Sequence, residues 1–364
     1  MRGIVTAAVA EPRHAFPRCQ RCGLFVNRAH RVRFRSYTPK TAAPRITAAA
    51  GSAAATNTKE NMLPPRRPMV VKCAYVAFCA CFGTLARLYT DEIQSSNVAL
   101  QGSFLSNSIG SFALGVLEAS DLNEEHLGGL YTGLTVGLCG SYTTFSGWNL
   151  RIGRVALGDA KGSTGGIFAA VSMVQTLAFF AVCYVAGRDL VKTLAENGRG
   201  RWRAGENGSR ATTGWGAFAG VVTVYIIMAI LLYVDDNQTR RIYWVACMLA
   251  PFGALLRFFL SMQLNESLRN GAFPAGTYLA NVLGSLALAL ASYGATGSDL
   301  SGWSGIVLKG FQGGFLGSFT TMSTFMKEVV GNRTSHGVAW SCLYLAATVA
   351  TALVLVLVVG AVLG

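Results

Sequence analysis

Long apolar runs separated by short polar stretches dominate the chain from residue 69 onward. The runs at 221–234 and 343–364 contain no charged residue. A run of about 20 apolar residues crosses a bilayer as a helix, because backbone polar groups in lipid must be paired internally. The pattern predicts nine spans, at 69–90, 98–118, 127–150, 163–187, 214–234, 242–262, 274–296, 303–328 and 337–363.

Three sequence blocks recur in the same order in the two halves of the chain. GTLAR (83–87) matches GALLR (253–257), GSFLSNSIGSFALG (102–115) matches GTYLANVLGSLALA (276–289), and GLCGSYTTFS (137–146) matches GFLGSFTTMS (314–323). Chance similarity among apolar helices could mimic one block of small residues, but hardly three in order. The blocks therefore indicate an internal duplication.

The even number of spans in each repeat then predicts the topology. The two repeats, 69–187 and 235–364, each hold four spans, so a direct fusion would insert both the same way up. The extra span at 214–234 follows a polar, basic linker at 188–213 and inverts the second repeat. We expect an all-α polytopic membrane protein, an inverted repeat of two four-helix units joined by a linking transmembrane helix.

Composition supports a membrane protein and shows where along the chain the excess positive charge lies. The chain is 52% hydrophobic and only 13% charged, whereas soluble proteins carry about 25% charged residues. The net charge of +14 comes mainly from residues 1–72, which hold 14 Lys and Arg against two acids, so it does not indicate a nucleic-acid-binding surface on the folded body.

The basic tail at 1–68 lacks periodic apolar residues and is expected to be disordered. It is compatible with a cleaved transit peptide, with a cytosolic tail that orients the first span, or with an over-extended start codon. We expect the plasma membrane, or an organellar membrane if the tail is a transit peptide. Cys19 and Cys22 form a lone CxxC, which is too few ligands for a zinc site.

Acidic residues are missing from the interior of the predicted spans, where Glu118 and Glu328 lie only at span ends. Coupled transporters usually use embedded acids or histidines as relays, so this class is disfavoured. The spans also lack the motifs of a metalloprotease, a phosphate-binding loop or a catalytic triad. The sequence therefore does not predict an enzyme.

Hydrogen-bond donors do occur within the spans, at matched positions. Asn107 and Asn281 are amides suited either to a partly dehydrated anion or to bonding between helices. Arg87 and Arg257 each follow a glycine by one helical turn. They are expected to set a positive field near a pore mouth, with snorkelling to the headgroups as the alternative.

The segments 140–144 and 317–321 should interrupt their helices, because each combines glycine with two consecutive threonines. Such breaks are tolerated at membrane depth only where protein or a cavity covers them. Two breaks related by an in-plane axis would meet near the bilayer centre, and their freed carbonyl groups could hold a hard cation such as Na⁺. Close helix packing through glycine and serine is the alternative.

TTFSGWN (143–149), TTMSTF (320–325), the two GxxxR blocks and the asparagine-containing helices together resemble the Fluc/CrcB/FEX fluoride channel family. The resemblance covers about 70–360 and is nearest to eukaryotic members, which fuse two units through a linking helix. It implies a passive fluoride-selective channel that exports F⁻, confers fluoride resistance and works as a single-chain pseudo-dimer in the lipid bilayer.

The resemblance also implies residue roles. Its implied pore-lining residues are Asn107, Phe145, Ser146, Trp148, Thr176, Asn281, Met322, Ser323, Phe325, Tyr344 and Thr348, with Ser172 as a further hydroxyl of the fourth span. The carbonyl groups of Gly140, Thr143, Gly317 and Thr320 are the implied ligands of a structural Na⁺. Ring edges, hydroxyls and amides can replace water around a small anion without trapping it.

Two departures from the family pattern predict unequal pores. Met322 and Trp148 stand where the family has phenylalanine, whereas Phe145 and Phe325 keep it. If each pore takes one aromatic residue from each repeat, Phe145 and Phe325 complete one working pore. The alternatives to a channel are a coupled exporter of small ions or drugs, which needs an embedded acid, and a non-transporting membrane scaffold.

Overall fold

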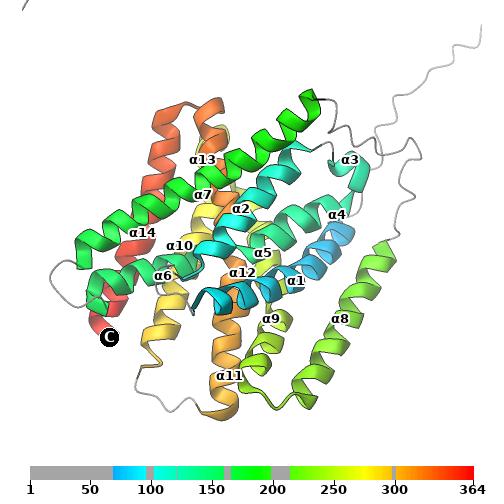
Figure 1. The fold of residues 1–364 in the computed structure, drawn as a ribbon, viewed down its shortest axis with the longest axis vertical. Helices are drawn as coiled ribbons and strands as arrows, with labels where there is room; N and C mark the ends of the chain where they lie inside the picture. Colours follow the sequence, from blue (N-terminus) through cyan, green and yellow to red (C-terminus); the bar gives the residue numbers. More distant parts are fainter. Residues whose placement is uncertain (1–68, 96–101, 121, 160–164, 198–213, 297–300) are drawn as a thin grey trace, which may run out of the picture. The chain divides into compact units, whose positions relative to one another are not determined.

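The computed structural model describes residues 69–95, 102–120, 122–159, 165–197, 214–296 and 301–364. The expected tail at 1–68, with Cys19 and Cys22, and most of the expected linker lie outside these residues. Every regular element in the described part of the chain is helical (Figure 1). The predicted all-helical, duplicated membrane fold is confirmed.

The first repeat consists of α1 (Met69–Ser95), α2 (Phe104–Ala119), a broken third span and α7 (Gly165–Glu196). The third span comprises α3 (Glu124–Leu127), α4 (Gly129–Thr132), η1 (Gly133–Cys139), α5 (Gly140–Tyr142), α6 (Phe145–Arg154) and η2 (Val155–Asp159). The helix α7 continues to Glu196, so the linker predicted to begin at residue 188 was placed too early. Polar residues at a helix end do not stop the helix where it projects beyond the packed core.

The second repeat follows the connecting helix α8 (Gly214–Val234) and has the same order. It comprises α9 (Gln238–Leu264), η3 (Arg269–Gly271), α10 (Ala275–Tyr293), α11 (Gly302–Phe311), η4 (Gln312–Leu316), α12 (Gly317–Phe319), α13 (Ser323–Ser335) and α14 (Val338–Leu363). A π-helical segment, η1 or η4, precedes the break in each repeat. Single π turns inside α-helices are frequent at functional sites.

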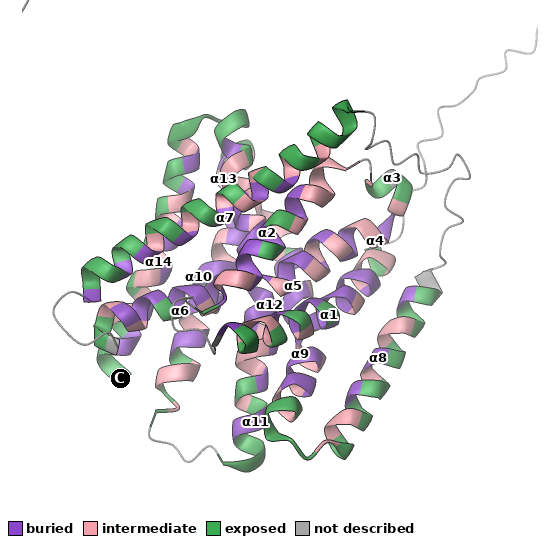
Figure 2. Cartoon of the chain, viewed as in Figure 1, coloured by how far each residue is buried: buried purple, intermediate pink, exposed green. Residues whose placement is uncertain are grey.

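Six helices in the described residues are long and apolar enough to cross a membrane, namely α1, α7, α8, α9, α10 and α14. The other three expected spans are α2, with 16 residues, and the two broken helices. Burial is concentrated where the broken helices pass through the interior, as at α5 and α12 in Figure 2. The fold therefore places its irregular backbone where protein covers it.

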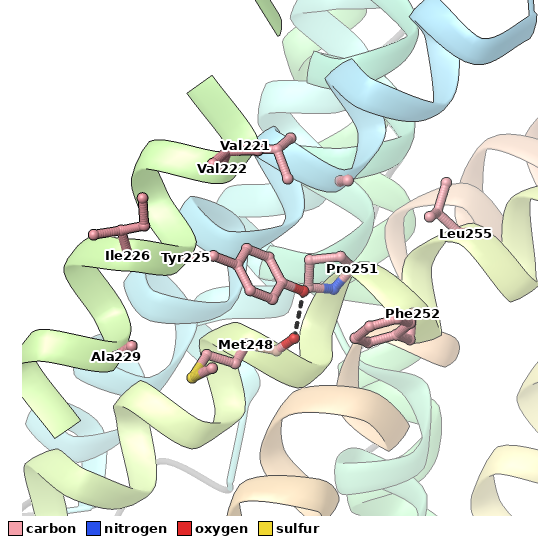
Figure 3. Close-up of a pocket in the computed structure, with 10 residues that line it drawn as sticks. Val221, Val222, Tyr225, Ile226, Ala229, Met248, Pro251, Phe252 and Leu255 are labelled. Atoms are coloured by element: carbon pink, nitrogen blue, oxygen red, sulfur yellow. Dashed lines mark hydrogen bonds between the residues drawn. The ribbon is translucent and has the colours of Figure 1, made fainter. Parts of the chain in front are cut away.

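The connecting helix α8 packs against α1 and α9, and α9 contains a proline, Pro251, within the helix. Proline has no N–H group for the carbonyl of Cys247, and the thiol of Cys81 donates to that carbonyl instead, with an S–O distance of 3.4 Å. The hydroxyl of Tyr225 on α8 donates to the Met248 carbonyl at 2.6 Å (Figure 3). An apolar pocket of about 620 Å³ lies between these three helices.

Candidate functional site

Each broken helix is held open by an asparagine from the second span of its repeat. Thr143 and Thr144 adopt extended backbone angles, with φ/ψ of −101°/150° and −140°/130°. The side chain of Asn107 accepts the Thr144 N–H at 2.8 Å and donates to the Thr144 carbonyl at 3.0 Å. One amide therefore pairs both the N–H and the carbonyl of Thr144.

The second repeat has the same arrangement. Asn281 accepts the Thr321 N–H at 2.9 Å and donates to the Thr321 carbonyl at 3.1 Å. An asparagine NH₂ group has two hydrogens, so each amide retains one for another partner. The predicted breaks exist, and both asparagines lie beside them.

The two breaks meet each other. Thr143 and Thr321 have their hydroxyl oxygens 3.3 Å apart, and those of Thr144 and Thr320 are 3.1 Å apart. Ser146 and Ser323 join the same hydroxyl cluster, at 2.9 Å from Thr320 and 3.0 Å from Thr143 respectively. Each threonine of one break contacts a threonine of the other, as expected for two repeats related by a pseudo-two-fold axis. The expected meeting of the two breaks is confirmed.

Arg87 and Arg257 bridge the repeats at the same place. Arg87 donates to the Ser141 carbonyl of its own repeat at 3.1 Å and to the Gly313 carbonyl of the other. Arg257 donates to the Ser318 carbonyl at 3.1 Å and across the interface to the Val136 carbonyl at 2.9 Å. Their exposed fractions are only 4% and 2%, so the snorkelling alternative is wrong. The partners of both guanidinium groups are backbone carbonyls, of Val136 and Gly313 in the π-helical segments η1 and η4 and of Ser141 and Ser318 just before the breaks.

The carbonyl groups expected to hold Na⁺ can be tested against this geometry. In an unbroken helix the Thr144 N–H would bond to the Gly140 carbonyl, but it bonds to Asn107 instead. The Gly317 carbonyl loses its helical partner in the same way, because the Thr321 N–H bonds to Asn281. Within the described residues no cluster of three or more His, Cys, Asp or Glu could hold a metal. Neutral carbonyl oxygens fit a hard cation of low charge.

A row of buried aromatic rings runs from one repeat into the other. Phe145 on α6 contacts Phe325 on α13 edge to face, with ring centroids 5.5 Å apart and planes at 84°. Phe325 contacts Tyr344 on α14 at 5.2 Å, and Phe145 contacts Trp148 at 5.4 Å. The side chain of Met322 is fully buried in the same apolar cluster. The structure thus brings Phe145 and Phe325 together across the repeat boundary.

The expected hydroxyls of the fourth spans occupy matched positions. Thr176 donates to the Ser172 carbonyl at 2.7 Å, and Thr348 donates to the Tyr344 carbonyl at 2.7 Å. The Trp148 indole N–H donates to the Thr176 hydroxyl at 2.9 Å. Trp148 therefore lies beside the fourth span of the first repeat, whereas Phe325 lies beside that of the second.

Sequence reasoning missed the partners of Glu328. Its carboxylate accepts hydrogen bonds from the Tyr344 hydroxyl at 2.6 Å, the Thr277 hydroxyl at 2.7 Å and the Asn265 side chain at 2.9 Å. Glu328, Tyr344 and Thr277 lie on α13, α14 and α10, and Asn265 caps the end of α9, so sequence spacing cannot bring them together. The cluster holds the Tyr344 ring beside Phe325.

A second carboxylate that the sequence reasoning missed lies in the first repeat. Asp91 falls within the last turns of α1, beyond the predicted end of that span, and accepts from Ser103 at 3.0 Å and Ser106 at 2.8 Å. The residue that corresponds to Asp91 in the second repeat is Ser261. The two repeats therefore take this carboxylate from different helices, Asp91 from α1 in the first and Glu328 from α13 in the second.

These features define a helical membrane protein built from an inverted duplication, with two broken helices that meet at its centre. The family model of CrcB-like proteins, described as Camphor Resistance (CrcB), matches twice, at residues 74–187 and 244–361. The chain belongs to the CrcB family. Each match covers one repeat, and neither includes the connecting helix α8.

Curated relatives carry related names. The chain is 42% identical over 123 residues to Fluoride export protein 1 of Candida albicans, covering 32% of this chain and 31% of that protein. It is 29% identical over 237 residues to Fluoride export protein 1 of Neurospora crassa, covering 57% and 43%. It is 34% identical over 110 residues to the Fluoride-specific ion channel FluC of Pseudomonas aeruginosa, covering 30% and 82%.

The matched region thus spans less than half of either fungal relative. No solved structure matches the chain. Membership of the family rests on the two family matches, and the arrangement of the site rests on the geometry described above.

Proposed function

We propose that the chain is a passive, fluoride-selective channel that exports F⁻ across a membrane and confers fluoride resistance. The observation that carries the proposal is the edge-to-face pair of Phe145 and Phe325, which is buried and joins the two repeats. Aromatic ring edges are electropositive and can stabilise an anion without a full positive charge. The names of the fungal and bacterial relatives support fluoride as the ion.

One working pore per chain follows from the difference between the halves. The working pore takes Phe145, Phe325, Asn281, Tyr344 and Thr348. The other pore takes Trp148, Met322, Asn107, Ser172 and Thr176, where the Trp148 indole is already bonded to Thr176. Conduction requires that the ion bind favourably but weakly along the pore. Two pores with different linings are therefore expected to conduct unequally.

A structural Na⁺ at the meeting of the breaks belongs to the same proposal. The carbonyl groups of Gly140, Thr143, Gly317 and Thr320 would hold it, and the cation would fix the two breaks against each other. The plasma membrane is the proposed location, where F⁻ moves outward under an inside-negative potential.

The decisive test is fluoride efflux from proteoliposomes, followed with an ion-selective electrode and with Cl⁻ as the control anion. We expect rapid F⁻ release without comparable Cl⁻ release, and growth rescue of fluoride-sensitive cells. Well-folded protein that releases no F⁻ would refute the proposal.

Two partly buried carboxylates favour one competing function, a coupled exporter. Asp91 and Glu328 are acids within the folded body, as a proton relay would require. A coupled exporter would make flux depend on a pH gradient at fixed voltage. The channel proposal expects flux to follow the F⁻ gradient and the voltage alone.

A further inference from the structure

Asn149 is a buried amide that the protein leaves unpaired. It follows Trp148 on α6, its exposed fraction is 0%, and neither Oδ1 nor Nδ2 has a hydrogen-bond partner among the described residues. Burying an amide without a partner is costly, and nearly all buried polar groups in native proteins are paired. A small species from outside the polypeptide, water or an ion, would complete these hydrogen bonds.

The position of Asn149 on its helix shows where that species would come from. Residues four apart on an α-helix lie on one face, so Asn149 lies between Phe145 and Gly153. Gly153 packs against Val356 of α14, because a Cβ added there would overlap the Val356 side chain. Asn149 therefore faces the interior on the side of α14, one turn beyond Phe145.

Ser285 on α10 has the same property. It is one turn beyond Asn281, it is fully buried, and its hydroxyl has no partner among the described residues. The helices α6 and α10 pack together, and Leu150 of α6 shares an apolar cluster with Leu288 and Ala289 of α10. Asn149 and Ser285 thus continue, by one turn each, two helices that carry residues of the proposed working pore.

The amide is present in one half only. The position matched to Asn149 in the second repeat is Met326, which is also buried, and the position matched to Ser285 is Ser111. Methionine has no N–H group to offer. The unpaired amide therefore lies on the side of the intact phenylalanine pair and has no equivalent on the other side.

The two unpaired atoms of Asn149 differ in what they need. The Nδ2 group can donate to an anion or to water, whereas Oδ1 can only accept, and fluoride has no hydrogen to give. A fluoride ion accompanied by a water molecule satisfies both atoms, with the Ser285 hydroxyl as a further donor. Bulk water does not enter the hydrocarbon region, so such a species arrives through the pore.

We infer that the Asn149 amide and the Ser285 hydroxyl form an additional fluoride site in the Phe145–Phe325 pore, occupied by F⁻ together with water. The inference rests on the proposed channel function and extends the pore one helical turn beyond the phenylalanine pair. It assigns to the first repeat a polar residue that the motif resemblance did not include.

Asn149→Met, which installs the residue of the matched position, is the first test. We expect F⁻ efflux from proteoliposomes to fall about tenfold or more, because a hydrogen bond to a charged partner is lost. The melting temperature should be unchanged or higher, since an unpaired buried amide is replaced by an apolar group. Wild-type efflux in this variant would overturn the inference, and Ser111→Ala, the matched control, should keep wild-type efflux.

Asn149→Asp separates fluoride from water as the occupant. It keeps an acceptor oxygen for water but removes the N–H donor and adds a negative charge. We expect efflux to fall at least as far as in Asn149→Met, and wild-type efflux would overturn a fluoride site. If neither Asn149 variant folds, Ser285→Ala provides the test. We expect its F⁻ efflux to be reduced, and unchanged efflux would count against the inference. A wild-type protein without F⁻ efflux would instead defeat the channel proposal itself.

Discussion

The guanidinium group of Arg257 lies against the α-carbon of Gly140, a residue of the opposite repeat, and leaves no room for a side chain there. Arg87 occupies the equivalent place against Gly317. The two glycines therefore serve a close approach between repeats, and each arginine reaches carbonyl groups in both halves of the chain.

Gly140→Ala and Gly317→Ala should destabilise the protein, because the new methyl group would overlap a buried guanidinium. Overpacking of this kind costs about 1–3 kcal/mol. Thermal unfolding in detergent would measure the loss. Gly331→Ala on α13 is the matched control, since nothing lies within 4 Å of its added Cβ, and alanine favours a helix over glycine by about 1 kcal/mol. Equal destabilisation of all three variants would contradict the proposed close approach.

Arg257→Lys should also lower stability and yield. Lysine is a point charge that cannot reproduce the planar fork by which Arg257 bonds to Ser318 and Val136. Leaving a buried charge short of partners costs about 3 kcal/mol or more. The exposed Arg333 on α13 provides the control, because Arg333→Lys should be silent. If the two variants melt at the same temperature, the bridging role is wrong.

Phe145→Ala and Phe325→Ala should each abolish F⁻ efflux, because either change removes one ring of the cross-repeat pair. Met322→Ala should be mild, since Met322 belongs to the other pore in the proposed scheme. Proteoliposome efflux at equal protein loading makes the comparison. Similar losses in all three variants would mean that the two pores are equivalent.

Tyr344→Phe should reduce both stability and efflux, because it removes one of three donors from the Glu328 carboxylate and frees the ring beside Phe325. The cost of leaving such a group short of a partner is about 1–3 kcal/mol. Tyr278→Phe is the control, since its hydroxyl makes only a 3.3 Å contact with Thr351. A control as impaired as Tyr344→Phe would show that the carboxylate cluster has no special role.

The loop between α8 and α9 should give the fold an acid-sensitive element. Hydrogen bonds from the Arg240 side chain and the Asn237 N–H hold the pKa of Asp235 well below its usual value. A carboxyl group with a lowered folded-state pKa stabilises the fold above its unfolded pKa of about 3.9, and that contribution disappears as the pH falls through the folded pKa. Melting curves of Asp235→Asn against wild type should converge in strong acid. A difference that stays constant with pH would exclude ionisation as the cause.

Much of the fold could be predicted from the sequence because membrane helices are built from local signals. Apolar run length gave the spans, and the three repeated blocks gave the duplication and its order. The breaks were predictable because glycine and paired threonines are poor helix formers. The end of α7 at Glu196 was not, because its last turns are polar and carry no stop signal.

The site was only partly predictable, because most of its contacts join residues far apart in the chain. Asn107, Phe145 and their matched partners could be found from motif spacing. The acceptors of Arg87 and Arg257 could not, because they are backbone carbonyls and any residue carries one. Asn149 escaped notice because a sequence shows that a residue is polar but not whether its side chain finds a partner.

The reciprocal arginine bonds bear on how the chain matures. When the ribosome has delivered only the first half to the bilayer, Arg87 lacks the Gly313 carbonyl and Val136 lacks its cationic donor. Arg257 arrives with α9 and Gly313 only with η4, so the centre can be completed only after most of the second repeat has been inserted. A chain truncated after the first repeat would keep the Arg87 charge within the membrane with one of its two carbonyl partners missing.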